Sequence, residues 1–397
     1  MVFVSCLKSK FGIIVASFFV FLCIFYLTTV KVYAYDASVT LNTQSSNQGG
    51  DFISIYSPDV TYYPDLNKYL MVYGANKVVR NSSNPICDQI YITENYSDGA
   101  NPNNWVNTRL LLPTGEYEKY FSVDHTDTYE SKDYLCIHDP SLVFVNGNWY
   151  LYYTGYGNKN DRTDSRNYVF LATSPDLIHW TKKGIVKGLS MENYSAGTFT
   201  GHPDILYNEK DHNFYLYFFT TKYWEIIVAE SYDGFNFTNK KGITGSGFNP
   251  NIAQHFNTYV LTFDLPVYEE NNRQYPLNNY EGIYYITSDN PTTFDINKKE
   301  LVIKRSNDNN TWYGWHIGTS SYEPITNKFY FFGNNFTTTH DLEFGKIGVI
   351  NNISIPPFYI EEDINKDTKI NIFDVLYGID NNLDISFQSK IIKMIFK

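Results

Sequence analysis

Side chains that could transfer protons recur at one position of a repeated sequence phrase. The phrase is a polar residue, a proline and a second polar residue, followed by an apolar strand, a short loop and a run of aromatic residues. The polar pairs are Ser57 and Asp59, Asp139 and Ser141, His202 and Asp204, Asn249 and Asn251, and, in a fainter copy, His316 and Ser320. Side chains two residues apart on a strand share a face. The repeats therefore predict three carboxylates and two imidazoles around one centre.

The segments that carry these residues read as short β-strands. Each unit continues through a third strand, a small polar turn and a fourth strand, and such turns favour Gly for its positive φ and Asp for the bonds to its own backbone. No long segment of residues 45–355 has apolar residues at helical spacing. Five such units predict an all-β fold, a five-bladed β-propeller over residues 45–355 whose first strands line the axis. Propeller channels are wet and accept polar side chains anyway, so the alternative for each of these residues is simple channel lining.

Composition fits this fold and excludes one class of partner. Aromatic residues make up 18% of the chain, and they favour the pleated, half-buried surfaces that blades stack together. The formal net charge is −11, and the chain has no basic stripe. Because nucleic-acid binding needs clustered Lys or Arg to neutralise phosphates, no nucleic-acid partner is expected.

The repeated phrase resembles that of the five-bladed glycosidases of glycoside hydrolase family 43 and its clan relatives, including the fructan hydrolases. The likeness spans roughly residues 45–355, and His138-Asp139-Pro140-Ser141 followed by Trp149-Tyr150-Leu151-Tyr152-Tyr153-Thr154 carries most of it. In that family, three carboxyl groups near the starts of the innermost strands act as base, pKa-tuning partner and acid. The resemblance implies a secreted glycoside hydrolase that acts on arabinose- or xylose-containing plant glycans or on fructans and needs no cofactor for catalysis.

The chain departs from the family pattern at the catalytic positions. Of the three carboxylates, only Asp139 stands directly before a proline. Ser57 takes that position in the first unit, and His202 takes it in the third unit, where a Glu is expected nearby. Asp59 and Asp204 could replace the missing carboxylates, so the predicted catalytic set is Asp139, Asp59 and Asp204. Asp51 and Glu192 on flanking loops are further candidates.

Other polar and aromatic residues near the predicted funnel are candidates for binding a sugar. They are His138, His202, His316 and Trp315, with Trp312 and Tyr313 as further aromatic surfaces. His316 resembles a fifth-blade histidine that many family members hold near a central ion, although a hydrogen-bonded core histidine is the simpler interpretation. Aromatic rings can stack on sugars, but blade packing also uses them. A propeller that has lost catalysis and binds glycans or a protein partner is therefore the alternative function.

The N-terminus predicts export from the cytoplasm. Lys8 and Lys10 precede an uncharged run over residues 11–30, and the small residues that end at Ala34 favour cleavage of a signal peptide over residues 1–34. The run is long enough to span a membrane, so an outward-facing membrane anchor is the alternative. An oxidising compartment would allow Cys87 and Cys136 to pair, and two buried free thiols are the other possibility.

A separate signal lies at the C-terminus, within residues 360–397. Oxygen-bearing side chains at the spacing of a calcium loop are Asp363, Asn365, Asp367, Asn371 and Asp374, and Lys369 offers its carbonyl. The loop resembles one half of a type I dockerin, which implies Ca²⁺ and a cohesin-type scaffold partner. Thr368 replaces the usual turn glycine, and no second copy follows. An acidic solvated tail is the alternative.

Overall fold

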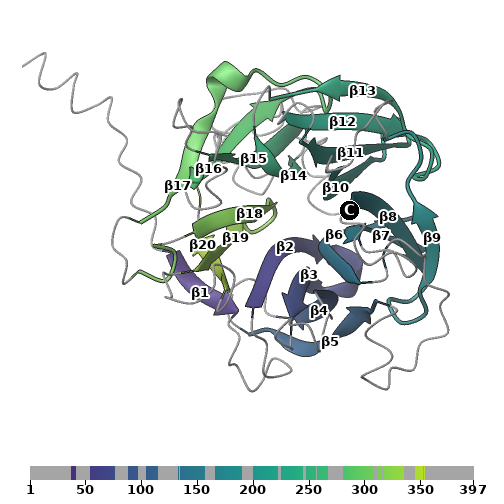
Figure 1. The fold of residues 1–397 in the computed structure, drawn as a ribbon, viewed down its shortest axis with the longest axis horizontal. Helices are drawn as coiled ribbons and strands as arrows, with labels where there is room; N and C mark the ends of the chain where they lie inside the picture. Colours follow the sequence, from purple (N-terminus) through teal and green to yellow (C-terminus); the bar gives the residue numbers. More distant parts are fainter. Residues whose placement is uncertain are drawn as a thin grey trace, which may run out of the picture. The chain divides into compact units, whose positions relative to one another are not determined.

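The structure is a five-bladed β-propeller, as the sequence predicts. In the computed structural model, five four-stranded antiparallel sheets stand around a common centre (Figure 1). The described residues are 37–41, 54–76, 88–96, 104–114, 133, 135–156, 166–189, 200–221, 225–244, 247–255, 257–266, 280–306, 311–314, 316–334, 345–351 and 353. Within these ranges the helical elements are two short 3-10 turns, η2 (Pro64–Leu66) and η4 (Ile296–Lys298).

Each blade is a sheet of four strands in which the first strand lies innermost. Blade one contains β2 (Ser54–Tyr63), β3 (Lys68–Asn76), β4 (Gln89–Asn95) and β5 (Val106–Leu112). Blade two contains β6 (Cys136–Val145), β7 (Asn148–Tyr156), β8 (Asn167–Ser174) and β9 (Thr181–Ile185). Blade three contains β10 (Thr200–Asn208), β11 (Asn213–Thr220), β12 (Glu225–Ser231) and β13 (Thr238–Gly242). Blade four contains β14 (Phe248–His255), β15 (Thr258–Pro266), β16 (Tyr280–Ser288) and β17 (Glu300–Lys304).

Blade five combines the two ends of the propeller. It contains β18 (His316–Glu323), β19 (Lys328–Asn334) and β20 (Lys346–Asn351), and its outermost strand is β1 (Ala37–Leu41). β1 pairs antiparallel with β20, with Ala37 opposite Ile350. This pairing closes the ring of blades, and it places β1 in the propeller although it precedes residue 45, where the sequence prediction begins the domain.

The apolar and aromatic runs form the layers between blades. All eight residues of β11 are buried, and Tyr217 and Phe218 have no exposed surface. The outermost strand of the same blade, β13, is exposed along its whole length and carries two lysines. Charged residues on an outer strand discourage pairing with other chains. The hydrophobic core therefore lies between neighbouring blades, around the funnel.

The five innermost strands share a bulge at the proline phrase. In β2, β6, β10, β14 and β18, one extra residue shifts the register with the second strand. The first bulged residue has a left-handed backbone, with φ of 49° at Ser57, 51° at Asp139, 48° at His202, 48° at Asn249 and 36° at Thr319. Such values are uncommon outside glycine and cost on the order of 1 kcal/mol or more. The extra residue interrupts the strict alternation of side chains in each innermost strand.

Five hydrogen bonds tie each innermost strand to the next and close a ring. In every blade, the side chain after the proline position accepts a hydrogen bond from a backbone N–H of the next blade. The pairs are Asp59 Oδ2 with Leu142 N at 2.7 Å, Ser141 Oγ with Ile205 N at 3.1 Å, Asp204 Oδ2 with Ile252 N, Asn251 Oδ1 with Tyr322 N at 2.9 Å, and Ser321 Oγ with Val60 N at 2.9 Å. All five accepting residues are at most 9% exposed. We call Asp59, Ser141, Asp204, Asn251 and Ser321 the latch ring.

Two further predictions concern the cysteines and the membrane. Cys136, the first residue of β6, is disulfide-bonded, so the free-thiol interpretation is wrong for this residue. Its expected partner, Cys87, and the N-terminal segment of residues 1–34 both lie outside the described residues. Among the residues that the structure describes, no helix is long and apolar enough to cross a membrane.

Candidate functional site

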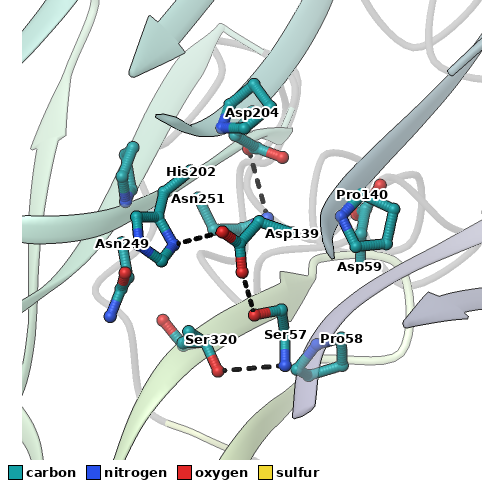
Figure 2. Close-up of a pocket in the computed structure, with 13 residues that line it drawn as sticks. Ser57, Pro58, Asp59, Asp139, Pro140, His202, Asp204, Asn249, Asn251 and Ser320 are labelled. Atoms are coloured by element: carbon teal, nitrogen blue, oxygen red, sulfur yellow. Dashed lines mark hydrogen bonds and ion pairs between the residues drawn. The ribbon is translucent and has the colours of Figure 1, made fainter. Parts of the chain in front are cut away.

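A cavity lies where the five innermost strands converge. Its volume is about 300 Å³. It is lined by Ser57, Pro58, Asp59, Asp139, Pro140, His202, Pro203, Asp204, Asn249, Pro250, Asn251, Thr319 and Ser320 (Figure 2). This volume includes space that is open to solvent, so the cavity is an open, largely polar funnel rather than an enclosed pocket. The cavity brings together all three predicted catalytic carboxylates and one predicted substrate-binding histidine.

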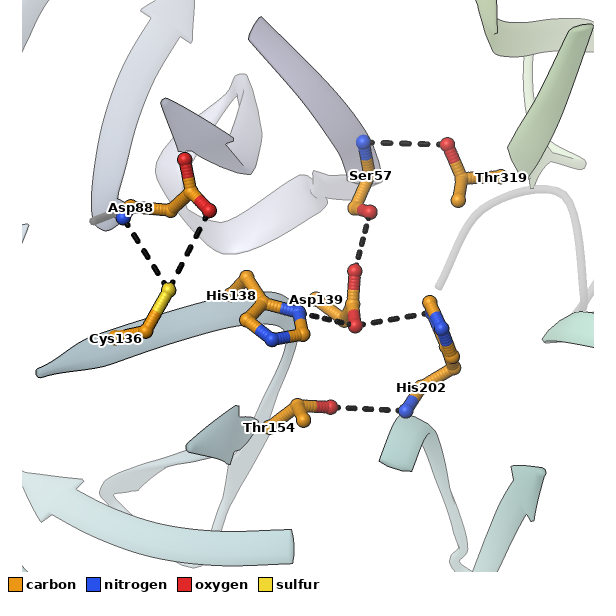
Figure 3. Close-up of polar contacts among 8 residues, drawn as sticks. All are labelled: Ser57, Asp88, Cys136, His138, Asp139, Thr154, His202 and Thr319. Atoms are coloured by element: carbon orange, nitrogen blue, oxygen red, sulfur yellow. Dashed lines mark hydrogen bonds and ion pairs between the residues drawn. The ribbon is translucent and has the colours of Figure 1, made fainter. Parts of the chain in front are cut away.

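Asp139 lies at the centre of a polar cluster beside this cavity (Figure 3). Its Oδ1 accepts a hydrogen bond from the Ser57 hydroxyl at 2.5 Å. Its Oδ2 lies 2.6 Å from Nδ1 of His138 and 2.9 Å from Nδ1 of His202. Both carboxylate oxygens therefore have partners, and Asp139 is only 5% exposed.

The charges in this cluster support one another. Burial opposes ionisation of Asp139, but the His138 and His202 imidazoles outweigh it and hold the pKa of the Asp139 carboxyl well below its ordinary value. Burial also acts to lower the pKa of His138, but the Asp139 carboxylate outweighs that effect and raises it above its ordinary value. The cluster thus favours an ionised carboxylate, which can orient or accept a proton and cannot serve as the acid.

Asp59 and Asp204 line the same cavity, but both belong to the latch ring. Besides its bond to the next blade, Asp204 accepts hydrogen bonds from Ser141 Oγ at 2.7 Å and Asn251 Nδ2 at 3.2 Å. Burial raises the pKa of Asp59 to about 6. Burial, and then the nearby charge of Asp59, raises the pKa of Asp204 well above its ordinary value. These contacts favour a structural role for both residues, and their catalytic roles stay predictions.

Sequence analysis missed one buried carboxyl next to the cavity. Asp264 on β15 has no exposed surface, and its Oδ2 accepts hydrogen bonds from Asn249 Nδ2 and, at 3.1 Å, from Thr319 N. Burial raises the pKa of Asp264 to about 8, against the effect of these two bonds. Asp264 therefore connects Asn249 of blade four to Thr319 of blade five, the bulged residues with a left-handed backbone in these two blades. A lone carboxyl within the apolar run of residues 260–265 is the sequence signal that could have found it.

The fifth blade requires a correction. The sequence prediction paired His316 with Ser320, but the bulge and the latch ring place Thr319 and Ser321 at the corresponding positions. His316 begins β18, three residues before Thr319. The register was mistaken because Ser320 stands where the other blades have the proline that marks the phrase. The side chain of His316 and all of Trp315 lie outside the described parts of the structure.

Several other predicted residues cannot be placed in the site. Trp312 stacks on Phe331 with ring centroids 5.2 Å apart, which is blade packing. Asp51, Glu192 and the calcium-loop residues Asp363, Asn365, Asp367, Lys369, Asn371 and Asp374 lie outside the described residues. In the part of the chain that the structure does describe, no group of three or more His, Cys, Asp or Glu side chains is arranged to hold a metal ion.

Solved structures with a similar fold are enzymes that act on glycans. The native arabinanase of Bacillus subtilis is 12% identical, with 79% of this chain and 97% of that chain covered and a TM-score of 0.51. The catalytic domain of the GH62 α-L-arabinofuranosidase of Coprinopsis cinerea is 10% identical, with 80% and 96% covered and a TM-score of 0.52. A structure from the GH130 family of mannoside phosphorylases, which contains glycoside hydrolases that target β-1,2 mannosidic linkages in Candida mannan, is 12% identical, with 82% and 96% covered and a TM-score of 0.50.

At the level of sequence the similarity is local. No protein-family profile matches the chain. A 1,2-beta-oligomannan phosphorylase from Thermoanaerobacter sp. (strain X514) is 40% identical over 63 residues, which are 16% of this chain and 20% of that protein. The matched stretch thus spans about a fifth of the relative's length. Together, the comparisons show that this chain shares the five-bladed propeller fold of glycan-active enzymes.

Proposed function

We propose that this propeller cleaves glycosidic bonds in its central cavity. The observation that carries the proposal is the cluster of Asp139, His138 and His202 beside the polar central cavity. Ionisable groups that perturb one another in a pocket are candidates for acid–base chemistry. The glycan-active enzymes that share the fold support the same reaction class.

Two substrate classes have support. The resemblance carried by the repeated phrase favours arabinose- or xylose-containing plant glycans or fructans, and two of the structural neighbours are an arabinanase and an arabinofuranosidase. The local sequence match favours β-1,2-mannosides, with phosphate rather than water as the acceptor. We take hydrolysis of plant glycans as the first candidate and phosphorolysis of β-mannosides as the second.

A propeller that only binds glycans is the alternative function. The observation that favours it is the latch ring, because the carboxyl oxygens of Asp59 and Asp204 accept hydrogen bonds from neighbouring blades. A binding protein would keep the cavity and its polar lining without converging catalytic carboxylates. Turnover separates this alternative from the enzyme.

We further propose that the chain acts outside the cytoplasm. The disulfide bond of Cys136 supports this location, since disulfides persist in oxidising compartments and are rare in the cytosol. The N-terminal apolar run over residues 11–30 supports it independently. A membrane anchor that faces outward is the alternative to a released protein.

The test is a product screen with the chain purified without residues 1–34. Arabinan, xylan, fructan and β-1,2-mannooligosaccharides are incubated with and without inorganic phosphate, and free sugars and sugar phosphates are measured by chromatography. Calorimetry measures binding of the same glycans in parallel. Phosphate-independent release of sugar from the first three supports the hydrolase, and sugar phosphate from the last supports the second candidate. Binding without products contradicts cleavage and favours the binding protein.

A further inference from the structure

One buried carboxyl holds two neighbouring residues of the cavity wall. Asp264 Oδ2 accepts hydrogen bonds from Asn249 Nδ2 and, at 3.1 Å, from Thr319 N. Asn249 lines the cavity (Figure 2), as does Thr319, whereas Asp264 itself has no exposed surface. Because both donors bind one oxygen atom, Asn249 and Thr319 lie side by side where blades four and five meet.

A carboxyl is more than the backbone requires at this position. In blade two, Thr154 occupies the equivalent place on the second strand, opposite the start of the bulge. Its Oγ1 accepts a hydrogen bond from His202 N at 2.9 Å, so a hydroxyl is enough to hold the backbone of the next blade. The equivalents in the other blades are Gly74, Phe219 and Phe332. A buried carboxyl costs free energy, and the contact that sets it apart here is the bond from the Asn249 amide.

This bond fixes which atom of the Asn249 amide is left for a ligand. Nδ2 donates to Asp264, so Oδ1 is the amide atom that remains. Among the described residues, Oδ1 of Asn249 has no hydrogen-bond partner, and the residue keeps 8% of its surface exposed on the cavity. Oδ1 is therefore a hydrogen-bond acceptor that faces the cavity.

Thr319 places a hydroxyl next to this acceptor. Its Oγ1 accepts a hydrogen bond from Ser57 N at 3.2 Å, so the hydroxyl proton remains to be donated. The residue is half-buried and lines the cavity. Asp264 holds its backbone and Ser57 holds its hydroxyl oxygen, so an oriented donor lies beside the oriented acceptor. A hydroxyl group of a sugar both donates and accepts, and it can therefore bind the two together.

We propose that Asn249 and Thr319 form a binding site for one hydroxyl group of a sugar, with Asp264 as the positioning residue. The sugar hydroxyl donates to Asn249 Oδ1 and accepts from Thr319 Oγ1. The ligand is a neutral sugar unit with a free hydroxyl at this place, and a unit that lacks the hydroxyl binds more weakly. The inference rests on the proposed function in that a glycan must occupy the cavity, and it applies to the enzyme and to the binding protein alike.

The protonation of Asp264 agrees with this role. Burial raises the pKa of its carboxyl to about 8, so the carboxyl carries a proton at neutral pH. Its Oδ1 is buried and has no hydrogen-bond partner among the described residues. A proton on Oδ1 leaves Oδ2 as the acceptor for both donors. A carboxamide has the same shape and can present the same acceptor, so Asn is the conservative replacement at this position.

Two pairs of variants separate hydroxyl binding from folding. Asn249→Ala removes the acceptor. Asn239→Ala is its matched control, because Asn239 is exposed on β13, also has a left-handed backbone with φ of 50°, and also donates through its amide to a carboxylate, that of Glu230 at 3.2 Å. Asp264→Leu removes the shared oxygen, and Asp264→Asn is the conservative variant that should restore the site.

The measurement compares a glycan with analogues that each lack one hydroxyl. Calorimetry gives the affinity of each variant for the best glycan of the product screen and for its monodeoxy analogues, and kcat/KM replaces affinity where the glycan is cleaved. Wild type should prefer the parent over one analogue by about 10-fold, because the analogue leaves the site unpaired. Asn249→Ala and Asp264→Leu should reduce this preference to about threefold or less, and Asn239→Ala and Asp264→Asn should keep it. A merely structural role would weaken binding of parent and analogue alike.

The outcomes separate this inference from the proposed function. If wild type binds or cleaves a glycan but distinguishes none of the analogues, or if Asn249→Ala keeps the full preference, the hydroxyl site is overturned while the function stands. If Asp264→Leu folds and keeps the preference, the positioning role is overturned. Should Asp264→Leu fail to fold, Asp264→Ala gives the same comparison with a smaller side chain. A wild-type protein that neither binds nor cleaves any glycan contradicts both the inference and the function.

Discussion

Asp204 offers the sharpest test of how the funnel is held together. It is 4% exposed and joins blade three to two other blades, through Ser141 of blade two and Asn251 and Ile252 of blade four. The substitution Asp204→Ala removes the acceptor and leaves three buried donors without it. Asp204→Asn keeps one carbonyl oxygen in nearly the same place and loses the other.

The expected loss follows from these three bonds. Each buried donor left unpaired lowers the free energy of unfolding by about 1–3 kcal/mol. The substitution also removes a buried carboxyl whose pKa is raised, which offsets part of this loss. We expect Asp204→Ala to lower the free energy of unfolding by about 3 kcal/mol and Asp204→Asn by roughly half as much. Because natural domains are stable by about 5–15 kcal/mol, the alanine variant should still fold.

Urea unfolding followed by tryptophan fluorescence measures the effect. Asp289→Ala is the control, because Asp289 is exposed in the turn after β16 and should change stability by less than about 0.5 kcal/mol. If Asp204→Ala unfolds at the same urea concentration as the control, the latch ring does not hold the blades. That result would favour the place of Asp204 in the catalytic set that the sequence predicts over a structural role.

Two further predictions concern pH and calcium. Because the pKa of Asp264 is raised to about 8, the folded state keeps a proton that the unfolded state has lost above about pH 4, so this residue makes stability fall as pH rises towards 8, by at most about 1.4 kcal/mol per pH unit. Asp264→Asn should remove that fall, and urea midpoints at pH 5 and pH 8 that run parallel to wild type would contradict it. The C-terminal loop should bind Ca²⁺ weakly in the full chain, with binding lost when Asp363→Ala and Asp374→Ala are combined. Calorimetry that detects no heat at millimolar Ca²⁺ would mean that the loop is vestigial.

The blade count was predictable because each blade repeats the same local sequence. A turn-forming proline phrase and an aromatic second strand are local signals, and they locate the innermost strands wherever the proline is present. The fifth blade shows the limit of this signal: with Ser320 in place of proline, His316 and Ser320 were assigned to the positions that Thr319 and Ser321 occupy. β1 was missed because Ala37–Leu41 has no distinctive pattern and its partner strand lies at the other end of the propeller.

The roles of the carboxyl groups could not be predicted in the same way. The sequence shows that Asp59 and Asp204 follow their prolines, but the backbone N–H groups that they hold belong to the next blade. Likewise, the contacts of Asp139 with Ser57 and His202 join residues 82 and 63 positions away in the chain. Only the closed ring of blades brings these partners together. Spacing along the chain could therefore indicate which residues lie at the centre of the propeller, but not which atoms each of them contacts.

The most direct test of the account is the activity of Asp139→Asn on the best substrate from the product screen. The substitution keeps the shape of the side chain and removes the charge that holds His138 and His202. With Asp289→Asn as a matched control, we predict a fall in kcat of about 10²-fold or more in a variant that still unfolds cooperatively. Turnover equal to that of wild type would show that the charged cluster takes no part in catalysis and would contradict the central claim.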